Sequence, residues 1–293
     1  MDAGCGEGMV NFTLIGVHVA YLLALGMFCV AVGWRFLEGR RRGAGEPPRV
    51  PRGRVMGGFY EWGDLVGLLM FFLLFYGFAV MGAGAEGGAE GGFVVGDVVF
   101  SILLQAVMPL GGYALVRRRV AVGEWLGLRW VGWRQVFGIA PLCVVGMFLF
   151  SVVLYVLGYQ ALLVDLGLGG EQEAVTLFRE GGDPLILGLM GFAAVLVAPV
   201  CEEVVFRGYL YPVAKRFGGV RVAAVFSALI FAAAHGNAAV MLPLFVFGLL
   251  LVWVYEFTGS IWAPIAVHLL FNGTTVGIQL LARFVELPET VMK

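Results

Sequence analysis

Long apolar runs alternate with short polar stretches along the whole chain. A membrane-spanning helix needs about 20 mostly apolar residues, and by this measure the pattern predicts about eight such helices. We expect them over residues 9–34, 64–83, 93–116, 136–158, 184–217, 220–235, 238–257 and 261–282. The fifth is too long for one upright span, so it is expected to tilt steeply or to continue past the bilayer surface. The pattern predicts an all-α polytopic membrane protein.

The composition supports lipid as the surrounding medium. Hydrophobic residues make up 60% of the 293 positions, charged residues only 13%, and the mean hydropathy is +0.93. A water-soluble globule of this length would need far more polar surface. The first apolar run lacks a preceding basic region, so it is interpreted as a retained helix and not as a secretory signal. The cysteines form no CxxC pair, which argues against a disulfide framework or a thiolate metal site: Cys5, Cys29, Cys143 and Cys201.

Positive charges gather in alternate loops, which predicts the orientation of the chain. The charged residues of the second loop are all acidic, whereas the first and third loops are rich in arginine. The first loop holds Arg35, Arg40, Arg41, Arg42, Arg49, Arg52 and Arg54, and the third holds Arg117, Arg118, Arg119, Arg129 and Arg134. The positive-inside rule places these two loops in the cytoplasm and the N-terminus outside. We therefore expect a multi-pass protein of a bacterial plasma membrane.

Three connecting stretches have distinct compositions. Residues 46–54 contain three prolines and are interpreted as a solvated linker. Residues 82–92 are rich in Gly and Glu, which favours a flexible loop. Residues 171–180, EQEAVTLFRE, predict a short amphipathic helix on the outer surface. No internal repeat is visible, so symmetry gives no support to an inverted-repeat transporter.

Three charged residues lie in the middle of the fifth apolar segment: Glu202, Glu203 and Arg207. A charge at the centre of a membrane helix costs about 2.5 to 3.5 kcal/mol on insertion scales, so these side chains need partners or a hydrated cavity. Glu203 and Arg207 are four apart, which places them on one helical face in the favourable order for an ion pair. Glu202 points about 100° away and is left to face something else. A plainer reading, in which both carboxylates serve a packing network around Arg207, stays open.

Counting residues from the turn at Gly218 and Gly219 relates Glu202 to a histidine in the next segment. Glu202 lies 16 residues before Gly218 and His235 lies 16 residues after Gly219. Each is therefore about 24 Å from the turn at 1.5 Å per residue. An antiparallel hairpin brings the two to the same depth, which favours a joint site over the common reading of a lone histidine as a satisfied core residue.

The last segment adds His268 and Asn272, which are four apart and lie on one helical face. Asn272 alone would suit an interhelical hydrogen bond worth about 1 kcal/mol. Because polar side chains on three helices avoid hydrocarbon, we expect them to meet in a hydrated cavity among the later helices. Together they can supply a general base, its orienting partner and donors to an oxyanion.

These residues resemble the signatures of the CAAX prenyl endopeptidase and bacteriocin-processing family, also called the Abi family, of intramembrane proteases. The first signature is a Glu-Glu pair with an arginine four residues after the second glutamate. It is matched by Glu202, Glu203 and Arg207, and Phe206 and Gly208 flank the arginine as is typical.

Two further signatures follow in order, each on its own predicted helix. Phe231 and His235 match a phenylalanine followed four residues later by histidine, and His268 and Asn272 match a histidine followed four residues later by asparagine. Each pattern alone is weak, but the three in order are specific. We expect residues 1–135 to form N-terminal membrane helices with basic loops, and residues 136–293 to hold the protease core at about 184–282.

The resemblance implies hydrolysis of a peptide bond within the membrane. Glu202 and His235 would activate a water molecule, and His268 and Asn272 would stabilise the tetrahedral oxyanion. The remaining signature residues would hold these groups in place: Glu203, Arg207 and Phe231. The substrate implied is a membrane-associated or lipidated protein or peptide, and no nucleic acid is expected as a partner.

Members of this family have also been named metalloproteases, so zinc stays an alternative. Glu202, His235 and His268 are able to bind zinc and leave a position for water. Yet their spacing is not HExxH and they come from three helices, so a metal-free, glutamate-based mechanism without a cofactor is preferred. Cys201 is rejected as a nucleophile because apolar surroundings disfavour the thiolate.

Two other classes of function stay open. Buried glutamate and histidine also form proton relays, which would suit a proton-coupled transporter. A non-catalytic membrane protein that protects against a peptide, or matures it by binding, is the other alternative. The substrate and the oligomeric state are left open by the sequence.

Overall fold

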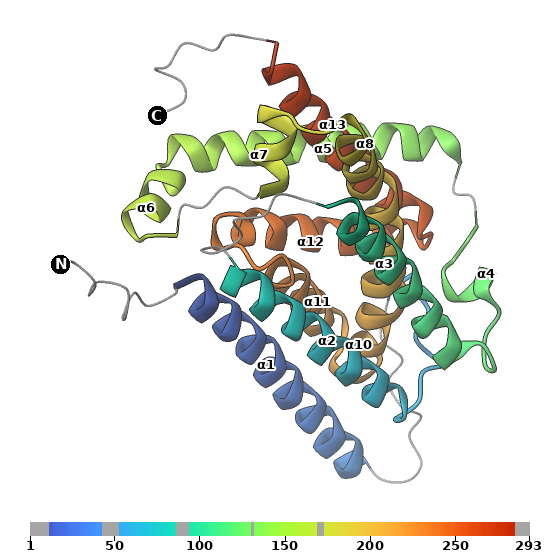
Figure 1. Cartoon of the computed structure of the whole chain (residues 1–293). Helices are drawn as coiled ribbons and strands as arrows, with labels where there is room; N and C mark the ends of the chain where they lie inside the picture. The colour runs from blue at the N-terminus through green and yellow to red at the C-terminus, as the bar shows by residue number, and fades with distance from the viewer. Residues whose placement is uncertain (1–11, 43–52, 86–93, 130–131, 169–172, 285–293) are drawn as a thin grey trace.

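The computed structural model describes residues 12–42, 53–85, 94–129, 132–168 and 173–284, and its regular structure over these ranges is helical throughout (Figure 1). Seven helical segments within them are long and apolar enough to cross a membrane. The prediction of an all-α polytopic membrane protein is confirmed.

Most of the predicted segments are single helices with nearly the expected bounds. The membrane-length ones are α1 (Phe12–Arg42), α2 (Asp64–Ala85), α3 (Val95–Val116), α5 (Trp133–Val156), α12 (Ala238–Thr258) and α13 (Trp262–Ala282). The short ones are α4 (Val122–Trp125), α6 (Tyr159–Asp165), α7 (Glu173–Glu180) and α11 (Val220–Ala233). α1 continues beyond its apolar run into basic sequence, and α7 confirms the short helix predicted from EQEAVTLFRE.

The sixth predicted segment differs from the expectation in its length. α11 has 14 residues, which span about 21 Å at 1.5 Å per residue, whereas the hydrocarbon core of a bilayer is about 30 Å thick. α11 packs against α1, α10 and α12, and most of its second half is buried. Protein surrounds much of this helix, so its length does not have to match the thickness of the bilayer.

The fifth predicted segment is a continuous helical rod of 35 residues, residues 184–218. Asp183 starts it by accepting a hydrogen bond from the Leu185 N–H at 2.7 Å, with Pro184 at the first helical position. Gly219 ends it with a φ of 88°, a conformation that favours glycine. Two π-helical stretches interrupt the rod, whose parts are α8 (Pro184–Phe192), η1 (Ala193–Val197), α9 (Ala198–Glu203), η2 (Val204–Leu210) and α10 (Tyr211–Gly218).

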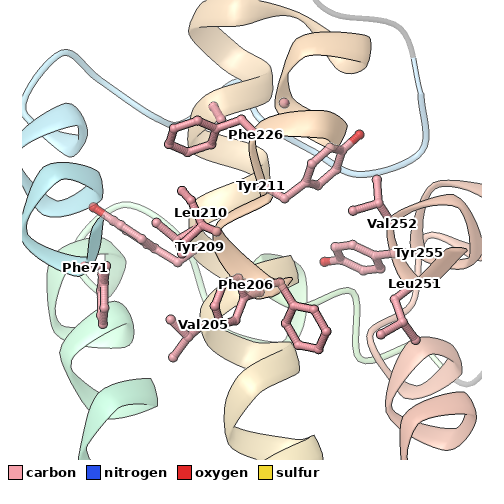
Figure 2. Close-up of a cluster of buried hydrophobic side chains, with 14 of the residues drawn as sticks. Phe71, Val205, Phe206, Tyr209, Leu210, Tyr211, Phe226, Leu251, Val252 and Tyr255 are labelled. Carbon is pink, nitrogen blue, oxygen red and sulfur yellow. The ribbon is translucent and has the colours of Figure 1, made fainter. Parts of the chain in front are cut away.

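The π-helical stretch η2 lies in the centre of the core. Figure 2 shows Val205, Phe206, Tyr209 and Leu210 projecting from it in different directions, and these side chains are at most 2% exposed. Phe71 of α2 packs against Tyr209 with ring centroids 5.6 Å apart. A helix that is buried on every side is surrounded by protein and not by lipid. The residues directly before η2 are therefore held at the centre of the helix bundle.

Two loop regions, residues 53–63 and 117–129, attach to this rod. Tyr60 donates a hydrogen bond to the carbonyl of Gly208 at 2.8 Å and accepts one from the Trp125 indole at 2.9 Å. Burial raises the pKa of Tyr60 well above its ordinary value, so the phenol stays a neutral donor. The linker predicted over residues 46–54 and the loop over 82–92 lie mostly outside the described residues.

Candidate active site

Glu203, Arg207 and His268 form an enclosed polar cluster. The Arg207 Nη1 donates to Glu203 Oε1 at 2.8 Å, and both side chains are 0% exposed. His268 Nδ1 lies 2.8 Å from the same oxygen, and because an ionised carboxylate only accepts, Nδ1 carries the hydrogen. The ion pair predicted from the spacing of four residues is confirmed, and a histidine from α13 joins it.

Arg207 has two further contacts that tie neighbouring helices together. Its Nη2 donates to the carbonyl of Gly248 in α12 at 3.2 Å. Its guanidinium lies over the ring of Phe231 in α11, 4.5 Å from the centroid, at the distance of a cation-π contact. α11, α12 and α13 thus all meet the rod at the Glu203–Arg207 pair.

Glu202 lines a different space. It borders a cavity of about 320 Å³, and His235 lies on the same cavity. The Glu202 side chain is 25% exposed, and its Oε2 is buried with no hydrogen-bond partner among the described residues. The other walls are mainly apolar and come from α2, α3, the rod and the residue directly after α11: Phe75, Phe78, Leu104, Met108, Cys201, Val205, Phe206 and Ala234. An unsatisfied carboxylate oxygen beside such a cavity calls for a functional explanation.

His235 lies in the turn between α11 and α12. Its Nδ1 is 2.8 Å from the carbonyl oxygen of Phe231, and since a carbonyl only accepts, Nδ1 carries the hydrogen, which in the neutral ring leaves the lone pair on Nε2. Gly236 then takes a φ of 62°, and Asn237 begins α12 by accepting a hydrogen bond from the Ala239 N–H at 2.9 Å. This turn holds the imidazole in the tautomer that a proton acceptor requires.

The two residues of the last signature have separate partners. His268 Nε2 is 3.9 Å from Glu202 Oε2, which is longer than a hydrogen bond. Asn272 donates to the carbonyl of Ala194 in η1 at 2.8 Å. Neither His268 nor Asn272 is among the described residues that line the cavity. Their contribution to an oxyanion site stays a prediction.

Two polar residues of α3 line the cavity although sequence reasoning did not single them out. Ser101 and Gln105 are four apart, and Gln105 Nε2 donates to Ser101 Oγ at 3.1 Å. The signal in the sequence was a glutamine in the middle of an apolar segment, a position where polar side chains are costly. It was missed because α3 lies outside the three signatures.

The ligand set considered for zinc is not assembled. Within the described ranges, no three His, Cys, Asp or Glu side chains form a group that could hold a metal ion. His235 and His268 each use Nδ1 for a protein oxygen, which leaves Nε2 of each ring as the nitrogen that could bind a metal. The preference for a metal-free mechanism over zinc stays a prediction.

The part of the chain that carries these residues matches a known family. Residues 184–274 match the family described as "Type II CAAX prenyl endopeptidase Rce1-like". The chain is 29% identical over 92 residues to "Putative membrane peptidase YdiL" of Bacillus subtilis (strain 168), which covers 31% of this chain and 38% of that relative. No solved structure shows a significant match. The resemblance stated from the three signatures is confirmed over the segment that contains them.

Proposed function

We propose that the protein is an intramembrane endopeptidase that hydrolyses a peptide bond of a membrane-associated or lipidated, CAAX-like protein or peptide. One observation carries this proposal: Glu202 and His235 line the same largely apolar cavity, where Glu202 Oε2 has no hydrogen-bond partner among the described residues. The family match over residues 184–274 supports the same class of reaction.

In this proposal Glu202 and His235 hold the attacking water between them. Glu202 accepts the proton that the water loses as it attacks the carbonyl carbon, and His235 Nε2 accepts a second hydrogen bond from the same water. When the tetrahedral intermediate collapses and the C–N bond breaks, Glu202 returns the proton to the departing amine nitrogen. General-base catalysis of this kind contributes about 10² to 10⁴ in rate. The apolar walls limit bulk water, which strengthens the electrostatic interactions inside the cavity.

His268 and Asn272 are proposed to stabilise the oxyanion. The Nδ1 hydrogen of His268 is donated to Glu203, so Nε2 can donate only when the ring carries both hydrogens. The two glutamates would then carry the negative charge that balances Arg207 and that imidazolium. Asn272 donates one amide hydrogen to Ala194 and retains a second. Each oxyanion donor is worth about 3 kcal/mol in reactions of this type.

The buried Glu203–Arg207 ion pair is proposed to hold the two residues that activate the water, Glu202 and His235, in position. Arg207 is held by Glu203 and packs on the ring of Phe231. The carbonyl of Phe231 in turn fixes the tautomer of His235. This chain of contacts links the Glu203–Arg207 pair to the His235 imidazole on the cavity. Glu203, Arg207 and Phe231 thus have a supporting role without contact with the substrate.

The test is hydrolysis by purified protein in liposomes. The wild type is expected to shorten an internally quenched peptide that ends in a farnesylated CAAX sequence, and mass spectrometry identifies the new terminus. Glu202→Gln is expected to leave the peptide intact. Glu180→Gln serves as the matched control, because the Glu180 side chain is 67% exposed on α7. Cleavage by Glu202→Gln at the wild-type rate would show that Glu202 is not the general base.

The same preparation separates the alternative functions. A transporter would show Glu202-dependent proton flux into the liposomes without any peptide product. A protein that only binds would retain the peptide with unchanged termini. Mass-spectrometric comparison of membrane peptides from cells that make the wild type or Glu202→Gln would identify the natural substrate.

A further inference from the structure

A row of polar residues runs along α3 towards the cavity. Asp97, Ser101 and Gln105 follow one another at intervals of four, so they lie along one side of the helix. Asp97 is in the first turn and exposed, whereas Ser101 and Gln105 line the cavity. The distance from Asp97 to Gln105 is about 12 Å at 1.5 Å per residue. Polar groups therefore reach the cavity from the end of the helix.

Gln105 lies on the face of α3 that contacts protein. It is seven residues after Val98 and seven before Gly112, and both of these are buried. A spacing of seven is nearly two turns, so the three share one face. α3 contacts the rod along α8, α9 and η2. The glutamine is thus directed at the segment that carries Glu202 and not at lipid.

The amide of Gln105 is only partly satisfied. Its Nε2 donates to Ser101, and its Oε1 is buried with no hydrogen-bond partner among the described residues. The oxygen and nitrogen of such an amide are assigned from the hydrogen-bond pattern, and with either assignment one end of the amide lacks a partner. Glu202 Oε2 on the same cavity also lacks one. Two incomplete polar groups from different helices therefore share one apolar-walled cavity.

We propose that Gln105 binds the main chain of the substrate peptide next to the scissile bond, as a positioning residue for the reaction proposed above, on which this inference rests. A peptide bond can be attacked only when its segment is extended, and the backbone N–H and C=O groups of that segment then lack helical partners. In an apolar cavity each unsatisfied group is costly. Gln105 Oε1 accepts a backbone N–H of the substrate, and Ser101 holds the amide in orientation.

Steady-state kinetics with the farnesylated reporter peptide tests this role. Gln105→Ala is expected to raise KM about tenfold and to change kcat less than about twofold, since the loss of one hydrogen bond of about 1.4 kcal/mol corresponds to a factor of ten. Gln160→Ala, at an exposed glutamine of α6, is the matched control and should leave both constants unchanged. An unchanged KM for Gln105→Ala overturns the proposal.

A series of reporter peptides distinguishes a hydrogen bond from a general packing effect. In each peptide one amide flanking the scissile bond is replaced by an ester, which removes a single N–H. The penalty of Gln105→Ala should disappear for the one ester that lacks the N–H bound by Gln105. An equal penalty for every peptide in the series contradicts the proposal. If Gln105→Ala lowers the melting temperature, Gln105→Met, which keeps the length of the side chain, replaces it in the same series.

Binding measured without turnover separates this inference from the proposed function. Affinity of the reporter peptide is compared between Glu202→Gln and the double variant Glu202→Gln, Gln105→Ala. A tenfold weaker affinity of the double variant supports the role of Gln105 even if the wild type cleaves no peptide. Equal affinities contradict that role even if the wild type is an active protease.

Discussion

The rod of residues 184–218 carries two buried ion-pair clusters, and they differ in how completely their polar atoms are satisfied. Near the C-terminal end of the rod, Lys215 pairs with Glu256 of α12, whose Oε1 also accepts a hydrogen bond from the Tyr211 hydroxyl at 2.6 Å. Glu256 Oε2 accepts from the Val55 N–H at 3.4 Å, and Lys215 donates to the Val55 carbonyl at 2.8 Å. Both oxygens of this carboxylate have partners.

The Glu202–Glu203 cluster lies near the middle of the same rod, and its hydrogen bonding is incomplete. Glu202 Oε2, Glu203 Oε2 and Arg207 Nε are buried and have no hydrogen-bond partner among the described residues. A cavity borders Glu202, whereas the residues around Lys215 are packed. Fully satisfied buried networks rigidify a core, and partly satisfied ones in natural proteins call for a functional explanation. We therefore expect the Lys215 cluster to stabilise the fold and the Glu202 cluster to take part in the reaction.

The largest effect is expected for Glu202→Gln. Loss of the base should lower kcat by about 10² to 10⁴, while the melting temperature in detergent stays unchanged, because Oε2 has no hydrogen bond to lose among the described residues. Reporter cleavage and thermal unfolding of the same preparation measure the two properties. A large drop in melting temperature would place Glu202 among the structural residues instead.

Glu203→Gln is expected to impair both properties. The substitution leaves the fully buried Arg207 without a charged partner, and breaking a buried pair in this way costs about 3 to 5 kcal/mol. His268 also loses the carboxylate that holds it, so kcat should fall as well. Unchanged stability together with lost activity would make Glu203 resemble Glu202 and would contradict the division of roles between them.

Lys215→Met is expected to lower stability alone. It leaves the half-buried Glu256 without its cation, at a cost of about 3 kcal/mol, and removes the hydrogen bond to the Val55 carbonyl. The kcat of the folded protein should stay within about twofold of the wild type. Thermal unfolding measures the stability and reporter kinetics measure kcat. A tenfold loss of kcat at unchanged stability would contradict a purely structural role of the Lys215 cluster.

Stringent chelation is expected to have the smallest effect. Within the part of the chain that the structure describes, no three His, Cys, Asp or Glu side chains form a group that could hold a metal ion. Reporter cleavage should therefore change less than about twofold after chelation, with metal analysis of the protein before and after treatment. Loss of a stoichiometric ion together with activity, and recovery on adding zinc, would show that the metal-free mechanism is wrong.

Local patterns allowed much of the fold to be predicted. The apolar runs located the membrane-length helices, and the spacing of four residues paired Glu203 with Arg207. The count from Gly219 related Glu202 to His235, which line one cavity. The π-helical stretches η1 and η2 were not predicted, because they depend on packing around the rod and not on a residue pattern of their own.

What the sequence by itself determined is the membrane setting, the order of helices and the contacts between residues one turn apart, because helical periodicity dictates them. Only the tertiary structure decided that His268 contacts Glu203, 65 residues away, at 2.8 Å, and that Asn272 contacts Ala194, 78 residues away. It also decided that Gln105 borders the cavity of Glu202. Such contacts depend on how each helix is rotated and tilted against its neighbours, which the sum of many packing contacts sets.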